Sequence, residues 1–162
     1  MCTPTDPGYY TTAGSKAQSL CSPGTFQANS FSSSCPSCLA GTYQDEAGQT
    51  ECKPCKKGFY CLAGASAALP CDPATYSGAT NLTNKTQCKP TEPGFFATTG
   101  SEAQTPCGPG TIAPYPSTSK CENCAAGKFR GGTTNATVCV ACERGYYCPP
   151  GTGAPLPCLE VR

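Results

Sequence analysis

The sequence has no histidine, no tryptophan and one methionine, and only 13% of its 162 residues are charged. Without histidine, hydrolases that depend on a Ser-His or Cys-His pair are excluded. The adjacent carboxylates Asp45 and Glu46 lie in a polar stretch, and neighbouring side chains on an extended chain point apart. We therefore expect solvated charges at these positions, no catalytic residues, no cofactor and no enzymatic activity.

Other absences concern partners and membranes. The formal net charge is +1 and no run of basic residues occurs, so neither nucleic acid nor an anionic membrane is an expected partner. No stretch of about 20 apolar residues is present, so no membrane span is expected. No charged and apolar leader follows Met1, so we expect a mature chain or an excised segment of a longer one.

Cysteine, glycine and proline are abundant instead. The chain has 16 Cys, 18 Gly and 17 Pro, a composition typical of a disulfide scaffold rather than of a single hydrophobic core. A disulfide that closes a loop of about 15 residues contributes roughly 3 kcal/mol in the chain-entropy model. We therefore expect cross-links to hold a fold with few helices and only small apolar clusters.

The cysteines form two copies of an eight-cysteine pattern. Residues 2–21 and 88–107 have 11 of 20 positions identical, and the correspondence continues with one inserted residue before Cys139. Tandem units of this kind contact mainly their neighbours, which predicts an elongated rod. The expected divisions are a first repeat at 2–71, a glycosylatable connecting loop at 72–87, a second repeat at 88–158 and the truncated start of a further segment at 159–162.

A shorter motif recurs inside each copy. It consists of Cys, two residues, Gly, often Thr and then an aromatic residue, as in CSPGTF at Cys21 and CLAGTY at Cys38. A second motif has Gly before two aromatics, as in Gly58-Phe59-Tyr60. The Pro-Gly pairs in several motifs mark turns with positive φ at Gly. Each motif predicts a short irregular hairpin with strands of about 3–5 residues. Its aromatic residue either packs locally over the sulfurs or belongs to a ligand-binding strip.

These motifs resemble the cysteine-rich repeats of the ephrin-receptor-like class, relatives of the tumour-necrosis-factor-receptor and growth-factor-receptor modules. The likeness covers nearly the whole chain and is most specific in CKPCKKGFYCLAGASAALPC at 52–71. It implies a small disulfide-rich fold, mostly irregular with short β-hairpins, in an extracellular or cell-surface protein. It also implies similarity to surface proteins of protists and algae, including flagellar-hair (mastigoneme) proteins.

Sequence alone leaves the disulfide connectivity open. The resemblance, together with the loop lengths, implies local pairing. Cys2 and Cys148 are then left over, and we expect them to bond between successive units, so that the partner is another copy of the repeat. The implied pairs are Cys21–Cys35, Cys38–Cys52, Cys55–Cys71, Cys61–Cys88, Cys107–Cys121, Cys124–Cys139 and Cys142–Cys158.

Zinc binding and redox catalysis are the chemical alternatives for the cysteines. The C-x-x-C pairs at 35–38 and 52–55, and those at 121–124 and 139–142, have the spacing of a four-cysteine zinc ribbon. That interpretation leaves eight further cysteines unexplained. A thioredoxin-like C-x-x-C requires a βαβ unit, and no segment has the pattern of a ten-residue helix. We therefore predict an oxidised, metal-free chain.

Three sequons predict N-glycans. They are Asn81-Leu82-Thr83, Asn84-Lys85-Thr86 and Asn135-Ala136-Thr137, each without Pro at the middle position. Asn81 and Asn84 are three residues apart, so on a strand their side chains would face opposite sides. An ordinary polar turn is the alternative interpretation of this pair.

Two functional classes are consistent with these features. The first is a secreted, glycosylated structural or surface protein whose stapled repeats form a rod or filament. The second is the ligand-binding, cysteine-rich ectodomain of a receptor. The close match between the copies, the low charge and the absence of a unique insertion favour the first class.

Overall fold

The computed structural model describes residues 4–132 and 136–159. Its regular structure consists of eight two-stranded antiparallel sheets and one 3-10 turn, η1 (Lys85–Gln87). This confirms the small disulfide-rich fold with short β-hairpins. The strands have two residues each, fewer than expected. Many of the second strands end in proline, as at Pro54 and Pro70, and proline has no N–H with which to extend the pairing.

The strands pair with their sequence neighbours. The pairs are β1 (Tyr9–Tyr10) with β2 (Ser19–Leu20), β3 (Thr42–Tyr43) with β4 (Lys53–Pro54), β5 (Phe59–Tyr60) with β6 (Leu69–Pro70), β7 (Thr75–Tyr76) with β8 (Lys89–Pro90), β9 (Phe95–Phe96) with β10 (Thr105–Pro106), β11 (Thr111–Ile112) with β12 (Glu122–Asn123), β13 (Lys128–Phe129) with β14 (Val140–Ala141), and β15 (Tyr146–Tyr147) with β16 (Leu156–Pro157).

These sheets belong to a regular series of hairpins that is finer than the two expected repeats. One hairpin is held by the single bridge Thr25–Ser37 in place of a sheet. The interval 72–87, expected as a connecting loop, lies within another hairpin. Whether the two copies fold independently with the expected boundaries stays a prediction. We number the hairpins one to nine; they span 5–20, 21–37, 38–54, 55–70, 71–90, 91–106, 107–123, 124–141 and 142–157.

Each hairpin opens with the same turn, which explains the C-x-x-G-T motif. In hairpin two, Gly24 has a φ of 83°, and the N–H of Thr25 donates to the carbonyl of Ser22 over 3.0 Å. The Thr25 hydroxyl donates to the same carbonyl over 2.6 Å. A positive φ at the fourth position favours glycine. Ala74 adopts the same conformation in hairpin five, with a φ of 70°.

The residue at this fourth position, which is glycine except at Ala74, links each hairpin to the next. Its carbonyl accepts the N–H of the first residue of the next hairpin, as in Cys21 N–H to Gly8 over 2.9 Å. Its own N–H donates to the carbonyl of the seventh residue of the next hairpin. The donor and acceptor residues of this second bond are Gly8 and Gln27, Gly24 and Gln44, Gly41 and Cys61, Gly58 and Ser77, Ala74 and Ala97, Gly94 and Ala113, Gly110 and Arg130, and Gly127 and Cys148.

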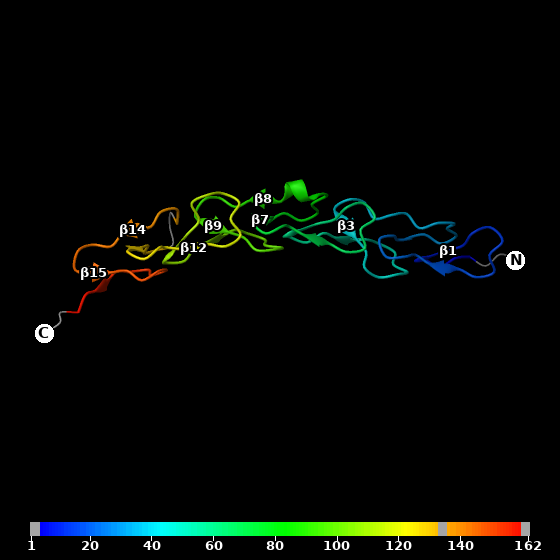
Figure 1. Cartoon of the computed structure of the whole chain (residues 1–162). Coiled ribbons are helices and arrows are strands. Elements are labelled where there is room, and N and C mark those ends of the chain that lie inside the picture. The colour runs from blue at the N-terminus through cyan, green and yellow to red at the C-terminus, as the bar shows by residue number, and fades with distance from the viewer. Residues whose placement is uncertain (1–3, 133–135, 160–162) are drawn as a thin grey trace. The chain divides into compact units, whose positions relative to one another are not determined.

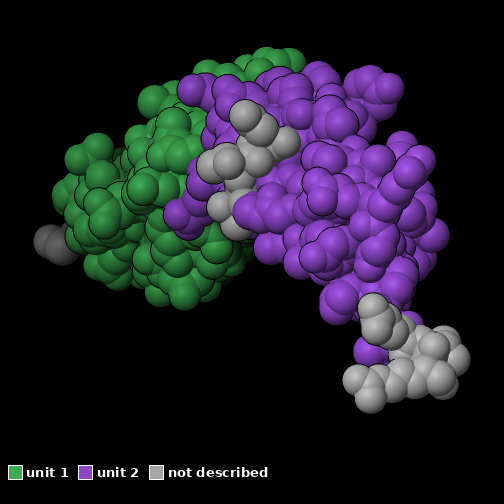
Figure 2. Space-filling view, turned by 90° about the vertical axis from the view of Figure 1, so that its left-hand side faces the viewer, with its two compact units in different colours: residues 1–71, 77–88 green, residues 72–76, 89–162 purple. Residues whose placement is uncertain are grey.

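Contacts divide the chain into two units, coloured separately in Figure 2. Unit 1 comprises residues 1–71 and 77–88, and unit 2 comprises 72–76 and 89–162. Within unit 2, β9, β12, β14 and β15 succeed one another in chain order (Figure 1). The largest apolar clusters are small: Cys71, Leu82 and Cys88 with Tyr60 in unit 1, and Cys107, Ala113 and Ala136 with Phe96 and Cys121 in unit 2.

Substitution of a covered turn glycine should be far more costly than substitution of its uncovered counterpart. A Cβ at Gly41 would lie 2.7 Å from the Asn81 carbonyl oxygen, whereas no described atom lies within 4 Å of one at Gly127. Both residues have positive φ. We expect Gly127→Ala to lower the free energy of unfolding by about 1 kcal/mol through backbone strain, and Gly41→Ala by about 2–4 kcal/mol. Denaturant unfolding without reductant measures both, and equal losses would contradict the packing argument.

Candidate functional site

Seven disulfides join cysteines of the described residues, all within single hairpins. Five of them close loops with a sequence separation of 14 to 17 residues. Four of these five are pairs that the resemblance implied. Their Cα–Cα distances lie between 5.7 and 5.8 Å, the usual range for a disulfide. These four are Cys21–Cys35, Cys38–Cys52, Cys107–Cys121 and Cys124–Cys139.

The interleaved pairs Cys55–Cys71 and Cys61–Cys88 are absent. The structure bonds Cys55 to Cys61 and Cys71 to Cys88, with Cα–Cα distances of 6.0 and 5.9 Å. The reason is the opening turn: it folds the seventh residue of a hairpin back towards the first. In hairpin four the G-F-Y-C motif places Cys61 at that seventh position, so the two cysteines meet directly.

The same correction applies in the second copy. Cys142 bonds Cys148 at a Cα–Cα distance of 6.1 Å, so Cys142 does not pair with Cys158, and Cys148 does not remain for a bond between units. Cys158 is instead free and exposed. Cys2 lies outside the described residues.

The structure does not gather the cysteines of the proposed zinc ribbons. Cys35, Cys38, Cys52 and Cys55 are distributed among three disulfides, which uses their sulfurs in separate bonds. In residues 4–132 and 136–159, no group of three or more His, Cys, Asp or Glu side chains has the geometry to hold a metal ion.

The backbone of the loop with two sequons is hydrogen-bonded to the start of hairpin four and continues into η1, and it is not a strand. Asn81 has a φ of 61°, and its N–H donates to the Cys55 carbonyl over 2.8 Å. Asn84 caps η1: its side chain accepts the Thr86 N–H over 3.0 Å and the Thr86 hydroxyl proton. Both asparagines are exposed, while Leu82 between them is 4% exposed. The loop therefore presents both amides on a clamped backbone. Asn135 lies outside the described residues.

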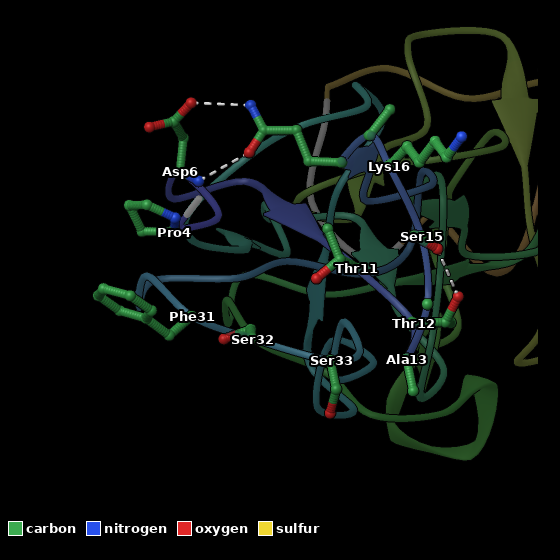
Figure 3. Close-up of a pocket in the computed structure, with 13 residues that line it drawn as sticks. Pro4, Asp6, Thr11, Thr12, Ala13, Ser15, Lys16, Phe31, Ser32 and Ser33 are labelled. Atoms are coloured by element: carbon green, nitrogen blue, oxygen red, sulfur yellow. Dashed lines mark hydrogen bonds between the residues drawn. The ribbon is translucent and has the colours of Figure 1, made fainter. Parts of the chain in front are cut away.

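An open pocket lies on the first hairpin (Figure 3). The loop from Thr11 to Gln18 lines it together with Pro4, Asp6 and the segment Phe31–Ser33 of hairpin two. Thr12 and Ser15 share a hydroxyl hydrogen bond of 2.9 Å, and Asp6 accepts from Gln18 over 2.8 Å. The Phe31 side chain is 79% exposed. The pocket holds polar hydroxyls and one aromatic ring, but no arrangement of acid, base and nucleophile.

Sequence reasoning missed the seventh position of the hairpins, where buried polar side chains satisfy carbonyls. Gln44 is 1% exposed and donates to the Glu51 carbonyl over 2.7 Å. Its counterpart Arg130 is 4% exposed. Arg130 Nη1 donates to the carbonyls of Gly108 and Gly132 over 3.0 and 2.9 Å, with longer bonds to Cys107 and Thr111. Their position directly after the aromatic residue of the Cys-x-x-Gly motif was the signal available in the sequence.

The carboxylates Asp45 and Glu46 are exposed, as expected, and they share one cation. Lys53 Nζ lies 2.6 Å from Asp45 Oδ1 and 3.7 Å from Glu46 Oε2. The hydrogen bond from Lys53 lowers the pKa of Asp45 below its usual range. A depressed carboxyl pKa favours the fold at pH values above the ordinary range and loses that contribution as the pH falls through it. Because the pair is exposed, it contributes little.

One stretch of the chain matches a known family. Residues 28–63 match the family described as tyrosine-protein kinase ephrin type A/B receptor-like. The chain carries a cysteine-rich, ephrin-receptor-like module. This stretch contains the disulfides Cys38–Cys52 and Cys55–Cys61. It also contains the hydrogen bond from the turn glycine Gly41 to the Cys61 carbonyl of the next hairpin. No curated protein matches the chain. The module and its disulfides are of an extracellular type. No helix of the described residues is long and apolar enough to cross a membrane.

The disulfide assignment has a direct chemical test. Peptide mapping without reductant is expected to find Cys55–Cys61 and Cys142–Cys148, and iodoacetamide should label Cys158 in the native protein. Cys35, which is half-buried but bonded, should stay unlabelled. A Cys55–Cys71 peptide or an unreactive Cys158 would contradict the assignment.

The buried guanidinium should stabilise unit 2. We expect Arg130→Ala to lower the free energy of unfolding by about 2–3 kcal/mol, because several buried carbonyls would lose their charged donor. Arg130→Gln, which restores the amide present at Gln44, should recover part of that loss. Equal and negligible losses in both variants, measured by denaturant unfolding without reductant, would show that the carbonyls find other donors.

Proposed function

We propose that this chain is a segment of an extracellular structural or surface glycoprotein, in which stapled hairpins form a stiff, elongated array. The proposal includes a non-enzymatic role, which is supported by the absence of histidine from the sequence. It also includes the likeness to protist and algal surface and flagellar-hair proteins, which rests on the cysteine motifs.

The observation that carries the proposal is the backbone ladder between successive hairpins. In each unit, four turn residues donate their N–H to the following hairpin. Parallel bridges add to these contacts, as between Tyr43 and Ala65, and between Tyr60 and Leu82. Hairpins one to eight thereby make the same contact, each with the hairpin that follows it. Such nearest-neighbour contacts are the basis of extended repeat arrays.

The disulfides support a stiff array in an oxidising compartment. Each described disulfide lies inside a single hairpin, so the sulfurs rigidify the repeating element and leave the ladder to join the elements. Bridges of this density form and persist in secreted proteins rather than in the reducing cytosol.

A ligand-binding receptor ectodomain is the second candidate. It is favoured by the ephrin-receptor-like match of residues 28–63 and by the open pocket beside Phe31 (Figure 3). The structural role explains more of the chain, because the same ladder recurs throughout both units. Electron microscopy of native material separates the two, since a structural protein is expected in filaments or layers and a receptor in discrete particles.

Small-angle X-ray scattering of the secreted, oxidised chain tests the elongated form. A compact domain of 162 residues would have a radius of gyration of about 15 Å. We expect a value well above this, with the intensity decay of a rod. The enzymatically deglycosylated protein serves as control, because glycans alone also enlarge the radius. A value near 15 Å after deglycosylation would contradict the rod.

Glycosylation is tested at each sequon separately. Asn81→Gln, Asn84→Gln and Asn135→Gln should each remove one N-glycan, seen as a stepwise mass loss and a smaller shift on glycosidase treatment. Asn29→Gln is the matched control, because Asn29-Ser30-Phe31 is exposed but lacks the sequon hydroxyl residue. Native protein whose mass is unchanged by glycosidase would refute the prediction.

A further inference from the structure

The backbone ladder is incomplete on the ninth hairpin. The N–H of Gly58 donates to Ser77, and the N–H of Cys61 donates to Leu82, over 2.8 and 2.9 Å. Their counterparts in the second copy are Gly145 and Cys148. Among the described residues, no acceptor receives the N–H of Gly145 or of Cys148.

A carbonyl and two aromatic rings are open on the same hairpin. The Cys55 carbonyl accepts the N–H of Asn81, but its counterpart, Cys142, accepts no hydrogen bond from a described loop. The side chains of Tyr146 and Tyr147 are 46% and 52% exposed, whereas Phe59 and Tyr60 are half-buried. Hairpin nine therefore has the donor, acceptor and apolar groups of a covered hairpin without the cover.

The turn glycines show how far this uncovered face extends. Gly41 is buried, and the Asn81 carbonyl of hairpin five closes over it. Gly24 and Gly110 are likewise buried under loops two hairpins further along, at Gly64 and Gly151. Gly127, the counterpart of Gly41, and Gly145 are both exposed, with no described atom within 4 Å of a Cβ at either. The open face thus includes Gly127 of hairpin eight as well as hairpin nine.

The first hairpin shows what happens when such a cover is missing. Its loop Gly14-Ser15 is exposed and lines the pocket of Figure 3. The identical dipeptide Gly100-Ser101 in hairpin six is half-buried, and Ser101 forms a parallel bridge with Tyr76 of hairpin five. The same dipeptide is therefore covered where a described hairpin contacts it and exposed where none does.

We propose that the face formed by Gly127, Cys142, Gly145, Tyr147 and Cys148 is a docking surface for a further hairpin of this repeat that begins at Cys158. The occupant is set by continuity with the existing interface, since hairpin four makes the same contacts with hairpin five. It would supply a seventh-position carbonyl to Gly145 and a loop carbonyl to Cys148. The inference deepens the proposed structural function. Its biological role rests on that function, whereas the docking itself does not.

Cys158 belongs to this docking. It is the counterpart of Cys71, which bonds Cys88 at a separation of 17 residues. The docked hairpin therefore carries a cysteine at about that spacing, which bonds Cys158. Each thiol gives up one hydrogen as the S–S bond forms, and the two electrons and two protons reduce a disulfide oxidant such as oxidised glutathione to two thiols.

The test adds the missing hairpin. Residues 159–162 are replaced by a copy of residues 72–90, so that Cys158 begins a second version of hairpin five. The protein is refolded with reduced and oxidised glutathione. We expect Cys158 to bond the grafted cysteine, and amide exchange at Gly145 and Cys148 to slow at least tenfold relative to the parent chain. Unchanged exchange at both amides would overturn the proposal, even if the disulfide forms.

Two variants separate docking from the disulfide. Hairpin six begins with Thr91 and has no internal disulfide, so an extended chain with both new-pair cysteines changed to serine should keep part of the amide protection. Gly127→Ala should remove that protection in the extended chain, because the grafted loop would meet the new Cβ as Asn81 meets Gly41. Equal effects of Gly127→Ala on parent and extended chains would count against docking.

Amide exchange at different protein concentrations also shows whether a second copy of the chain covers this face. Protection of Gly145 in the parent chain that rises with protein concentration would identify a second copy as the occupant and overturn the proposal. The scattering, microscopy and glycan experiments do not use these amides, so the proposed function and the docking surface succeed or fail separately.

Discussion

The hydrogen bond from a turn residue at positive φ to the next hairpin is the interaction on which the rest of the structure depends. In the opening turn, the residue at positive φ directs its N–H out of its own hairpin and donates to a carbonyl of the following one. In hairpin three this bond joins Gly41 to Cys61 over 2.8 Å. The absence of a side chain at Gly41 also admits the Asn81 loop of hairpin five. One backbone conformation thereby sets contacts to the next hairpin and to the one after it.

The disulfides act on a different scale from this ladder. They close individual hairpins, and the length of the closed loop varies. The loop is long in Cys38–Cys52 and short in Cys55–Cys61, and hairpin six, which begins at Thr91, has no disulfide. In hairpin six the buried Thr91 side chain instead bonds to hairpin seven, where it accepts the Thr118 N–H over 2.8 Å. Burial of a sulfur pair, or of a hydrogen-bonded hydroxyl, satisfies the same position. The ladder requires the turn and does not depend on whether a disulfide closes the hairpin.

Much of this arrangement could be predicted from local sequence. Pro-Gly and C-x-x-G motifs specify the turn directly, because few residues other than glycine tolerate positive φ. The threonine after Gly24 was visible, and its hydroxyl bond explains it. The Cys55–Cys61 pair was missed because loop length and family likeness favoured longer loops, whereas the turn brings positions one and seven together. The burial of Arg130 was missed. Its position after the aromatic residue was visible, but the carbonyls of Cys107, Gly108, Thr111 and Gly132, which accept from it, come together only in the fold.

A backbone interface also accounts for the uneven resemblance to known proteins. The seventh position holds Gln44 in one copy and Arg130 in the other, yet the carbonyls of Gln44 and Arg130 receive equivalent ladder bonds, from Gly24 and Gly110. Side chains can diverge while the contacts persist. The family match is confined to residues 28–63, although the ladder bonds recur along both units.

The nesting of each disulfide inside one hairpin has a mechanical consequence. If the chain ends were pulled apart, the ladder bonds would break first. The residues between two bonded cysteines could not extend, because the disulfide holds the ends of their loop together. Between Cys35 and Cys38, only Pro36 and Ser37 would extend freely, and between Cys52 and Cys55 only Lys53 and Pro54. An oxidised chain would therefore extend only in the segments outside its disulfides, such as hairpin six, and a reductant would release the residues held inside each disulfide loop.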